Sequence, residues 1–223
     1  MSYFIFKDIS SENFNNLIVE SLPPIVKPPK RYDLQEIDGS SKIGVDILGY
    51  KAYEKTIPLG FRNSNIYEVM DWLDGKGKLI LSNELDKYYN VFVLDQIDYK
   101  RVLRFRKATV TFLVMPYKYA TGEEETTSRL LINQGNTDCL PLMTIYGSGK
   151  VSVLVNGVKQ CETTIDGYVT LDGEEKEAYK DSLASRRNRV MIGDFPVFKP
   201  GENKITFTGN VTNVKTLVRS RWL

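Results

Sequence analysis

The sequence contains no histidine among its 223 residues, and its only cysteines are Cys139 and Cys161. Without histidine a chain cannot build Ser-His-Asp or Cys-His nucleophile systems, or zinc sites that depend on imidazole ligands. Two thiols without histidine partners do not predict a metal site, and in a cytoplasm we expect them to be reduced. The composition therefore argues against these nucleophile systems and most zinc sites. Together with the weak catalytic motifs described below, it leads us to expect a protein that is not an enzyme and that uses no cofactor and no metal.

Long hydrophobic runs and strong net charge are also missing. No apolar stretch approaches the roughly 20 residues that span a bilayer. The first ten residues lack the basic start and small-residue cleavage site of a signal peptide. We therefore expect synthesis in a cytoplasm and no membrane insertion. The formal net charge is only +2, and neither half of the chain has the basic excess of a nucleic-acid-binding protein.

One local basic cluster is the exception, formed by Lys100, Arg101, Arg104, Arg106 and Lys107. In a strand, Arg104 and Arg106 share one face because successive side chains alternate. A solvated strand accounts for the cluster, while an intermolecular salt-bridge surface and a phosphate-binding patch remain as alternatives. The low overall charge favours a subunit or channel surface over a site that reads nucleic acid.

The most regular pattern of the chain is Arg104–Tyr119, which alternates as a strand does. Pro116 cannot donate a ladder hydrogen bond, so we expect this strand to end there or to run along a sheet edge. A polar, glutamate-rich stretch follows and is typical of a linker. The sequence therefore predicts a first domain over 1–120, a linker over 121–127 and a second domain over 128–223.

The first domain is expected to be antiparallel β structure. Leu17–Val19 predicts a strand, and the four prolines between Pro23 and Pro29 predict an extended crossing segment, since proline suits neither helices nor central strands. Tyr32–Ile37 and Tyr50–Leu59 alternate on either side of a polar loop and predict a hairpin. Neither face of this hairpin is cleanly apolar, so we expect it to stand in solvent or to pair with a neighbouring subunit.

One helix is predicted, over Asn65–Asp74. Asn65 is a good N-cap residue with Glu68 three positions later, and Gly75 can end the helix in a left-handed conformation. The expected buried face consists of Ile66, Val69, Met70 and Leu73. A Gly-Lys-Gly-Lys turn should then lead into a short strand over Leu79–Leu81, and another strand is expected over Tyr89–Leu94.

The second domain shows short strand patterns, frequent turn signals and no helical period, which predicts an all-β sandwich. Asn156-Gly157 is a strong signal for a two-residue hairpin turn. The expected strands are Arg129–Asn133, Leu142–Tyr146, Lys150–Val155, Val158–Thr163, Tyr168–Asp172 and Lys204–Gly209.

Three sets of residues could carry chemistry, and each has a simpler explanation. Gly147–Lys150 looks like part of a phosphate loop but lacks its spacing and its following helix, so a hairpin turn accounts for it. The acidic runs Glu123–Glu125 and Asp172–Glu177 could serve glycoside hydrolysis or calcium binding, but solvated loops explain them. Surface aromatics could stack on sugars, although a core position is commoner; the candidates are Tyr146, Tyr168, Tyr179 and Trp222.

With these motifs in place, the chain resembles the distal tail proteins of long-tailed, non-contractile bacteriophages that infect Gram-positive bacteria. The resemblance covers nearly the whole chain and depends on the order and spacing of its motifs. The motifs are the proline-rich crossing, RYDLQEIDGSSK…LGYKAYEKTI, NIYEVMDWLDGKGKLILS, FRKATVTFLVMPYKY, NQGNTDCLPLMTIYGSGKVSVLVNG and GDFPVFKPGENKITFTGNV.

The resemblance implies a mainly β, β-rich α+β chain. An N-terminal belt domain related to tail-tube proteins, with one α-helix, would form a homohexameric ring, and a C-terminal galectin-like β-sandwich would decorate it. The implied role is a virion structural hub at the distal end of the tail, assembled in the bacterial host cytoplasm. It would join the major tail tube protein to the tail-associated tip or lysin protein and to receptor-binding proteins, and leave a channel through which DNA passes.

From the residues we place the subunit interface on the predicted hairpin and on the basic strand, because ring contacts are heterologous and need two different surfaces. The candidate interface residues are Tyr32, Tyr53, Ile57, Arg104 and Arg106. The alternative function is a carbohydrate-binding module that uses the C-terminal β-sandwich. A ring with a central hole would support the hub, and a monomer that binds glycans would support the module.

Overall fold

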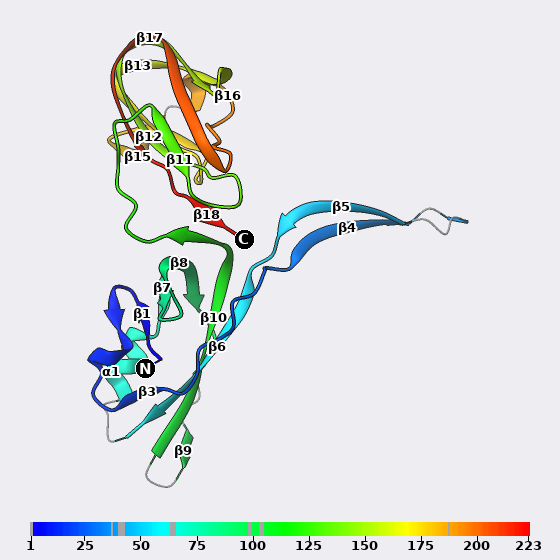
Figure 1. Cartoon of the computed structure of the whole chain (residues 1–223), viewed down its shortest axis with the longest axis vertical. Helices are drawn as coiled ribbons and strands as arrows, with labels where there is room; N and C mark the ends of the chain where they lie inside the picture. Colours follow the sequence, from blue (N-terminus) through cyan, green and yellow to red (C-terminus); the bar gives the residue numbers. More distant parts are fainter. Residues whose placement is uncertain are drawn as a thin grey trace. The chain divides into compact units, whose positions relative to one another are not determined.

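The computed structural model describes residues 2–36, 38–39, 43–62, 66–97, 100–102, 105–186 and 188–223 (Figure 1). The chain divides into two compact units. The first comprises the residues up to Thr121 together with Leu223, and the second is Gly122–Trp222. Both units are built mainly from β-strands, and one α-helix occurs among the described residues. The predicted β-rich α+β class is confirmed.

The first unit contains an antiparallel sheet with the strand order β2-β1-β7-β8-β10-β6-β3, in which β9 also pairs with β10. A separate two-stranded sheet is formed by β4 and β5. The strands of this unit are β1 (Phe4–Phe6), β2 (Ile9–Ser10), β3 (Leu17–Val19), β4 (Lys30–Glu36), β5 (Ile43–Tyr50), β6 (Tyr53–Phe61), β7 (Gly75–Leu81), β8 (Glu84–Val93), β9 (Lys100–Val102) and β10 (Phe105–Ala120). A 3-10 helix covers Ser11–Asn13.

Alternation along β10 produces the core of this unit. The predicted alternation is confirmed, and the face that points inward is the one formed by Ala108, Val110, Phe112 and Val114, which are all buried. Of the two alternatives predicted at Pro116, an end of the strand is wrong, because β10 continues to Ala120. Its pairing with β8 shifts register between Val114 and Lys118. Pro116 therefore lies in a bulge, where its missing N–H leaves no ladder bond unmade.

Helix α1 (Ile66–Trp72) packs its apolar face on this core. Of the predicted face, Val69 and Leu73 are buried, whereas Met70 is 41% exposed and Trp72 is buried in addition. The prediction is therefore wrong only at Met70. The Trp72 ring stacks on Phe4 at 5.1 Å, and its indole N–H donates to the carbonyl of Phe6 at 2.9 Å. A large ring with a satisfied polar group fixes the helix better than the flexible Met70 side chain would.

The end of the helix follows the prediction in part. Gly75 has a φ of +66°, in the left-handed region that favours glycine. It is also the first residue of β7, so the predicted turn over Gly75–Lys78 is instead part of that strand. The predicted N-cap, Asn65, lies outside the described residues.

The predicted hairpin pairs differently. Its first strand is β4, but its partner is β5 (Ile43–Tyr50), whose residues were assigned to the connecting loop. The expected second strand lies mostly in β6, which is held between β10 and β3 inside the main sheet. The assignment of Tyr50–Leu59 to an arm without a core is therefore wrong.

The second unit is a curled antiparallel sheet around its own core, with the strand order β11-β17-β12-β13-β14-β15 and with β16 on β13. A 3-10 helix covers Asn188–Val190. The strands are β11 (Leu130–Asn133), β12 (Leu142–Val155), β13 (Val158–Asp172), β14 (Glu177–Lys180), β15 (Ser182–Arg186), β16 (Met191–Gly193), β17 (Gly201–Leu217) and β18 (Arg221–Trp222).

Several predicted short strands are in fact halves of long ones. Leu142–Tyr146 and Lys150–Val155 are one strand, β12, so the turn predicted at Gly147–Lys150 is a bend within it. At this bend the pairing with β17 shifts register twice. A Cβ atom on Gly147 would lie 2.1 Å from the carbonyl oxygen of Asn210, so only glycine lets the two strands approach here.

The Asn156-Gly157 turn is confirmed as the connection between β12 and β13. Both residues have positive φ, +52° and +81°, which is the type I′ pattern that matches strand twist. The Asn156 side chain accepts a hydrogen bond from the backbone N–H of Lys204 at 2.8 Å, which ties the turn to β17.

Candidate functional site: an exposed apolar ribbon

The clearest unexplained surface of the first unit is the two-stranded sheet β4–β5, which we call the ribbon (Figure 1). Directly opposed residues share a face, and the pairs Tyr32–Ile47 and Leu34–Val45 are opposed. One face of the ribbon, the apolar face, therefore carries large hydrophobic side chains at both of these pairs, and it continues to Ile43, which lies opposite Glu36. Its members and their exposed fractions are Tyr32 (54%), Leu34 (50%), Ile43 (56%), Val45 (56%) and Ile47 (58%).

The opposite face of the ribbon is polar. Asp33 lies directly opposite Asp46, an arrangement of like charges that destabilises a strand pair. The amide of Gln35 donates to a carboxylate oxygen of Asp46 at 2.6 Å and offsets part of that repulsion. Two-stranded sheets are marginally stable in water even without such a pair, so the ribbon needs a partner to be a fixed element.

The exposed area of the apolar face is large for a surface of this kind. Five half-exposed side chains of this size present roughly 500 Å², which is about the largest apolar patch found on a typical monomer. Such patches mark interaction sites, because leaving them in water forgoes roughly 25 cal/mol for each Å² that could be buried. The ribbon is therefore the candidate functional site of the first unit.

The structure separates the predicted interface residues. Tyr32 is on the apolar face, and Arg106 is exposed on β10 opposite Phe61. Ile57 is fully buried in the core of its own unit, so its side chain is unavailable to a neighbouring subunit. Tyr53 packs beside that core. Arg104 lies outside the described residues.

Burial also explains the chemistry of Tyr53. Removal from water, and then the charge of Glu84, raise the pKa of Tyr53 to about 12. A hydroxyl held in this way belongs to the interior of the unit rather than to an exposed arm.

The sequence reasoning missed Ile43, Val45 and Ile47, although a signal for them was present. Ile-Gly-Val-Asp-Ile alternates with period two, but glycine and aspartate at its polar positions made it look like a loop. The polar residues face away from the apolar side, as an amphipathic ribbon requires.

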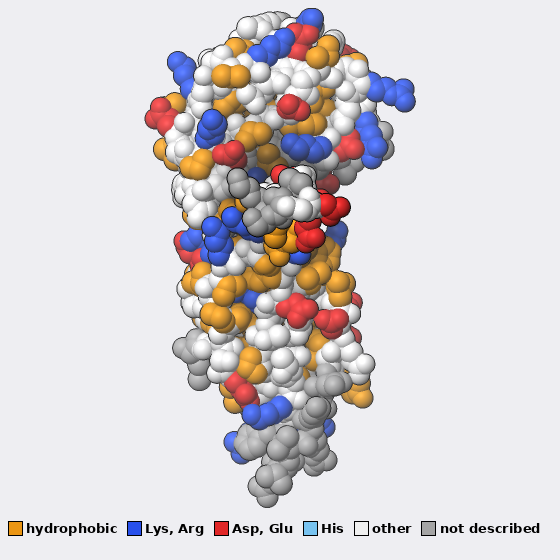
Figure 2. Space-filling model, turned by 90° about the vertical axis from the view of Figure 1, so that its right-hand side faces the viewer, with side chains coloured by type: hydrophobic (Ala, Val, Ile, Leu, Met, Phe, Trp, Pro, Cys, Tyr) orange, Lys and Arg blue, Asp and Glu red, His pale blue; other side chains and the backbone are white. Residues whose placement is uncertain are grey.

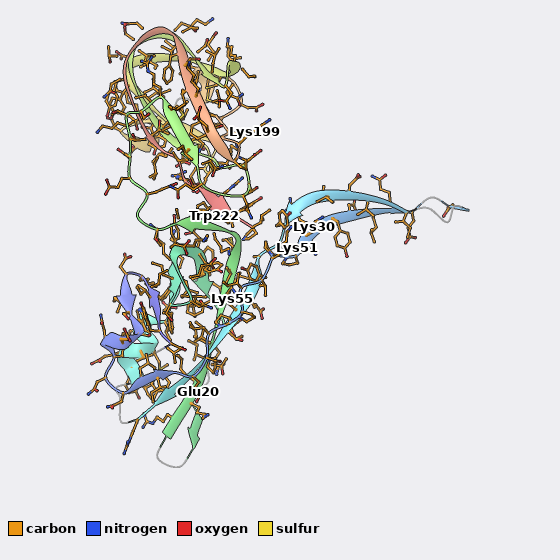
Figure 3. All side chains as sticks on the ribbon, in the orientation of Figure 1. Glu20, Lys30, Lys51, Lys55, Lys199 and Trp222 are labelled. Atoms are coloured by element: carbon orange, nitrogen blue, oxygen red, sulfur yellow. The ribbon has the colours of Figure 1, made fainter. Side chains whose placement is uncertain are left out.

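A second feature, which we call the crossing, is the segment over residues 20–29 that precedes the ribbon. It runs along β6: the Glu20 N–H donates to the carbonyl of Pro58 at 3.0 Å, and the Lys51 N–H to that of Pro29 at 2.8 Å. Figure 3 shows Glu20, Lys55 and Lys51 following one another along this course. The predicted extended crossing is thus observed, and it covers part of the β6 edge.

A buried lysine fastens the crossing. Lys55 is 3% exposed, and its ammonium donates to the carbonyl oxygen of Pro24 at 2.6 Å. The same ammonium lies 5.3 Å from the ring centre of Tyr89. Burial lowers the pKa of Lys55, against the opposing influence of Glu84 and with that of Lys118.

The carboxylate of Glu84 supplies a negative charge near the two buried lysines, Lys55 and Lys118. This carboxylate accepts a hydrogen bond from Lys118 at 2.7 Å and another from the hydroxyl of Tyr89 at 2.8 Å. Burial, followed by the hydrogen bond to Glu84, raises the pKa of Tyr89 far above the usual range. Because each polar group has a partner, this cluster has the properties of a structural network that holds the crossing in place.

The sites considered for catalysis have structural roles. Gly147–Lys150 is a bend within a strand. Both carboxylate oxygens of Glu123 accept from the backbone N–H of Ser220 at 3.0 Å. Asp172 binds Arg219 through two hydrogen bonds, at 2.6 and 3.1 Å. No cluster of acidic and cysteine side chains in the described part of the chain has the arrangement of a metal site.

Neither thiol is poised to react. Cys139 and Cys161 are both free and buried, and burial raises their pKa values to about 12 and about 11, respectively. Within the described ranges, the helices are too short or too polar to cross a bilayer.

The tyrosines of the second unit lie on the outer face of its sheet. Tyr146 and Tyr168 are a cross-strand pair with ring centres 5.7 Å apart. The Tyr168 hydroxyl donates to Asp181, and the Lys180 ammonium lies 5.6 Å from the Tyr168 ring centre. Tyr179 is opposite Thr170 on the same face. These rings are half-buried, so none of them is a core residue as the commoner alternative predicted.

On the face of the molecule in Figure 2, hydrophobic side chains reach the surface of the first unit among separate groups of acidic and basic ones. The sequence and the fold of this chain differ in what they match among known proteins. No family model matches the sequence, and no curated protein matches it. Solved structures do match, and their fold is that of phage adsorption hubs and baseplates.

Three matching structures illustrate this likeness. One is the crystal structure of the SPP1 Dit (gp 19.1) protein, described as a paradigm of the hub adsorption apparatus in Gram-positive infecting phages. It has a TM-score of 0.73 and 15% identity, over 100% of each chain. Two others are the phage P2 baseplate in its activated conformation with Ca and with Sr. Their TM-scores are 0.55 and 0.54 at 10% and 9% identity, over 96% of each chain. The resemblance to distal tail proteins is therefore confirmed for the fold.

Proposed function

We propose that the protein is a structural component of a phage tail tip or baseplate, located at the distal end of the tail. The observation that carries the proposal is the match of the whole chain, both units included, to a solved adsorption-hub protein. A match over one unit alone would be weak evidence, because unrelated proteins often share a common fold. A match over two units in the same order is much stronger evidence.

The proposed hub is a homohexameric ring with an open channel. A closed ring needs two different surfaces on each subunit, one of which meets the other on its neighbour. The apolar face of the ribbon supplies one such surface, and it includes the predicted interface residue Tyr32. Arg106 is exposed on β10 and is retained as a candidate at the ring or channel surface.

The proposed partners follow from a position between tube and tip. One end of the ring would meet the major tail tube protein, and the other the tail-associated tip or lysin protein and receptor-binding proteins. The second unit would decorate the ring as a galectin-like β domain. DNA would pass through the channel without being read, which agrees with the low net charge of +2. The role is non-enzymatic and uses no cofactor.

The test is the mass and shape of the purified protein. Light scattering combined with negative-stain microscopy should give a six-fold ring with a central hole. A chain that stays monomeric at every concentration up to the solubility limit would contradict the hub, since the proposed function depends on assembly.

A second candidate function is carbohydrate binding by the second unit. The observation that favours it is the half-exposed pair Tyr146–Tyr168 on the outer face of the sheet, with Asn213 next to Tyr146 as a hydrogen-bonding side chain. Aromatic faces flanked by such groups can stack on sugar rings. A glycan array tests this function directly. If the second unit binds glycans, Tyr146→Ala should lose that binding and still form the same ring as the wild type.

A further inference from the structure

We infer that the apolar face of the ribbon packs on the crossing of a second copy of the chain. The inference rests on the proposed ring, and it names the surface of the neighbour that receives the ribbon. The occupant must come from outside the chain, since every large side chain of the apolar face remains at least half exposed within it.

The crossing has the chemistry that an apolar face requires. Ile25 is 54% exposed and Val26 is 40% exposed, although both belong to a segment that is tied to the sheet. Between Ser21 and Pro29 the only charged residue is Lys27. Its ammonium is on a long flexible stem and can stay in water while the stem lies along an apolar surface.

Proline makes this irregular segment suitable for burial. A loop buried in an interface must find partners for its backbone N–H groups, and each N–H left unpaired costs about 1–3 kcal/mol. The crossing avoids part of that cost because four of its residues, Pro23, Pro24, Pro28 and Pro29, have no N–H. The carbonyls of Pro24 and Pro29 are already bonded to Lys55 and Lys51.

The crossing is also fixed before any partner arrives. Lys55 holds its middle, Glu20 and Lys51 hold its two ends, and the Glu20 carboxylate lies 2.8 Å from the Lys107 ammonium. A receptor surface that is already ordered loses little conformational entropy on binding. The ribbon would then be the element that becomes ordered, and the crossing the rigid surface on which it orders.

One other surface of the first unit competes for the ribbon. A hollow of about 550 Å³ lies beside the end of α1 and includes the apolar residues Met70 and Leu94. Three carboxylates line the same hollow, from Asp71, Asp74 and Asp95. Covering them with the apolar face would remove their water without supplying a cation, which is costly. The one carboxylate of the crossing, that of Glu20, already lies 2.8 Å from the ammonium of Lys107, so the crossing is the better match.

Cysteine cross-linking tests the contact directly. The double variant Val45→Cys with Ile25→Cys places one thiol on each proposed surface of every subunit. The native thiols should not interfere, because Cys139 and Cys161 are buried. Treatment with a short bis-maleimide should give a ladder of covalent oligomers on a denaturing gel, with loss of most of the monomer band.

The matched control is Asp33→Cys with Ile25→Cys, which moves the ribbon thiol to the polar face of the same strand pair. Its monomer band should remain. A third pair, Val45→Cys with Leu94→Cys, reports on the hollow. Light scattering before cross-linking shows whether each variant still forms the wild-type assembly.

The outcomes separate the inference from the proposed function. Assembled protein with a ladder only for the pair that joins Val45 to Ile25 supports both. Assembled protein with no ladder for that pair, or with a stronger ladder through Leu94, overturns the crossing as receptor and leaves the ring intact. A wild-type chain that never assembles overturns the ring, and the inference with it.

Discussion

The substitution Val45→Asp should prevent assembly without unfolding the subunit. Val45 is 56% exposed, and its partner across the ribbon is Leu34. Burial of this side chain between subunits would contribute about 1–1.5 kcal/mol, and an unpaired carboxylate buried in its place would cost several kcal/mol more. A loss of about 4 kcal/mol at each contact weakens that contact by roughly a thousandfold.

The stability of the subunit itself should change little. The side chain packs against little within its own chain, so the free energy of unfolding should change by less than about 0.5 kcal/mol. Light scattering over a concentration series measures assembly, and urea unfolding of the dissociated chain measures stability. The matched control is Gln35→Lys, which places a positive charge on the polar face beside the opposed pair Asp33–Asp46 and should keep the assembly.

Two results would refute this reasoning. If Val45→Asp assembles at wild-type concentrations, the apolar face is not buried between subunits. If Gln35→Lys disrupts assembly equally, the two faces of the ribbon are equivalent and the amphipathic argument fails. Unfolding of the isolated Val45→Asp subunit would show instead that the ribbon supports its own unit.

Three further predictions concern the units themselves. Trp72→Ala should lower the free energy of unfolding by about 3–5 kcal/mol in urea titrations, because it empties a packed site and leaves the Phe6 carbonyl without its donor. Gly157→Ala should cost about 1 kcal/mol by the same method, since the site is open but its φ is +81°. Asp172→Asn should destabilise by about 3 kcal/mol at pH 7. Burial raises the pKa of Asp172, but the hydrogen bonds from Arg219 and from two backbone N–H groups outweigh it and lower that pKa. The stabilisation is therefore present above the ordinary carboxyl pKa of about 4 and disappears as pH falls through the lowered value, so the variant and wild type should converge in acid.

Local features were predictable because local chemistry determines them. The inward face of β10 follows from alternation over Ala108–Val114, and the turn at Asn156-Gly157 follows from the backbone freedom of those two residues. Both are decided within a few residues, and the structure confirms both.

Pairing was not predictable in the same way. Tyr32–Ile37 could pair with any alternating stretch nearby. It pairs with Ile43–Tyr50 and not with Tyr50–Leu59 because most of the latter lies in β6, which already pairs with β10 and β3. Those partners lie far away in the sequence. The burial of Lys55 is likewise non-local, because its partners come from Pro24, Tyr89 and Glu84 on separate segments.

The candidate site was found only in part for the same reason. Tyr32 was identified because it is an aromatic residue in an alternating strand, whereas Ile57 looked exposed only under the wrong pairing. Val45 and Ile47 became visible once the register put them opposite Leu34 and Tyr32. A one-position shift in register would have moved every one of these side chains to the other face.

The strand order of the second unit has a consequence for biosynthesis. β17 lies between β11 and β12, yet Gly201–Leu217 leaves the ribosome after both of them. Until then β11 has no partner strand and one side of β12 is open, so the buried side chains that β17 supplies, such as Ile205 and Val214, are missing. The second unit is therefore expected to complete its sheet only after nearly the whole chain has been made.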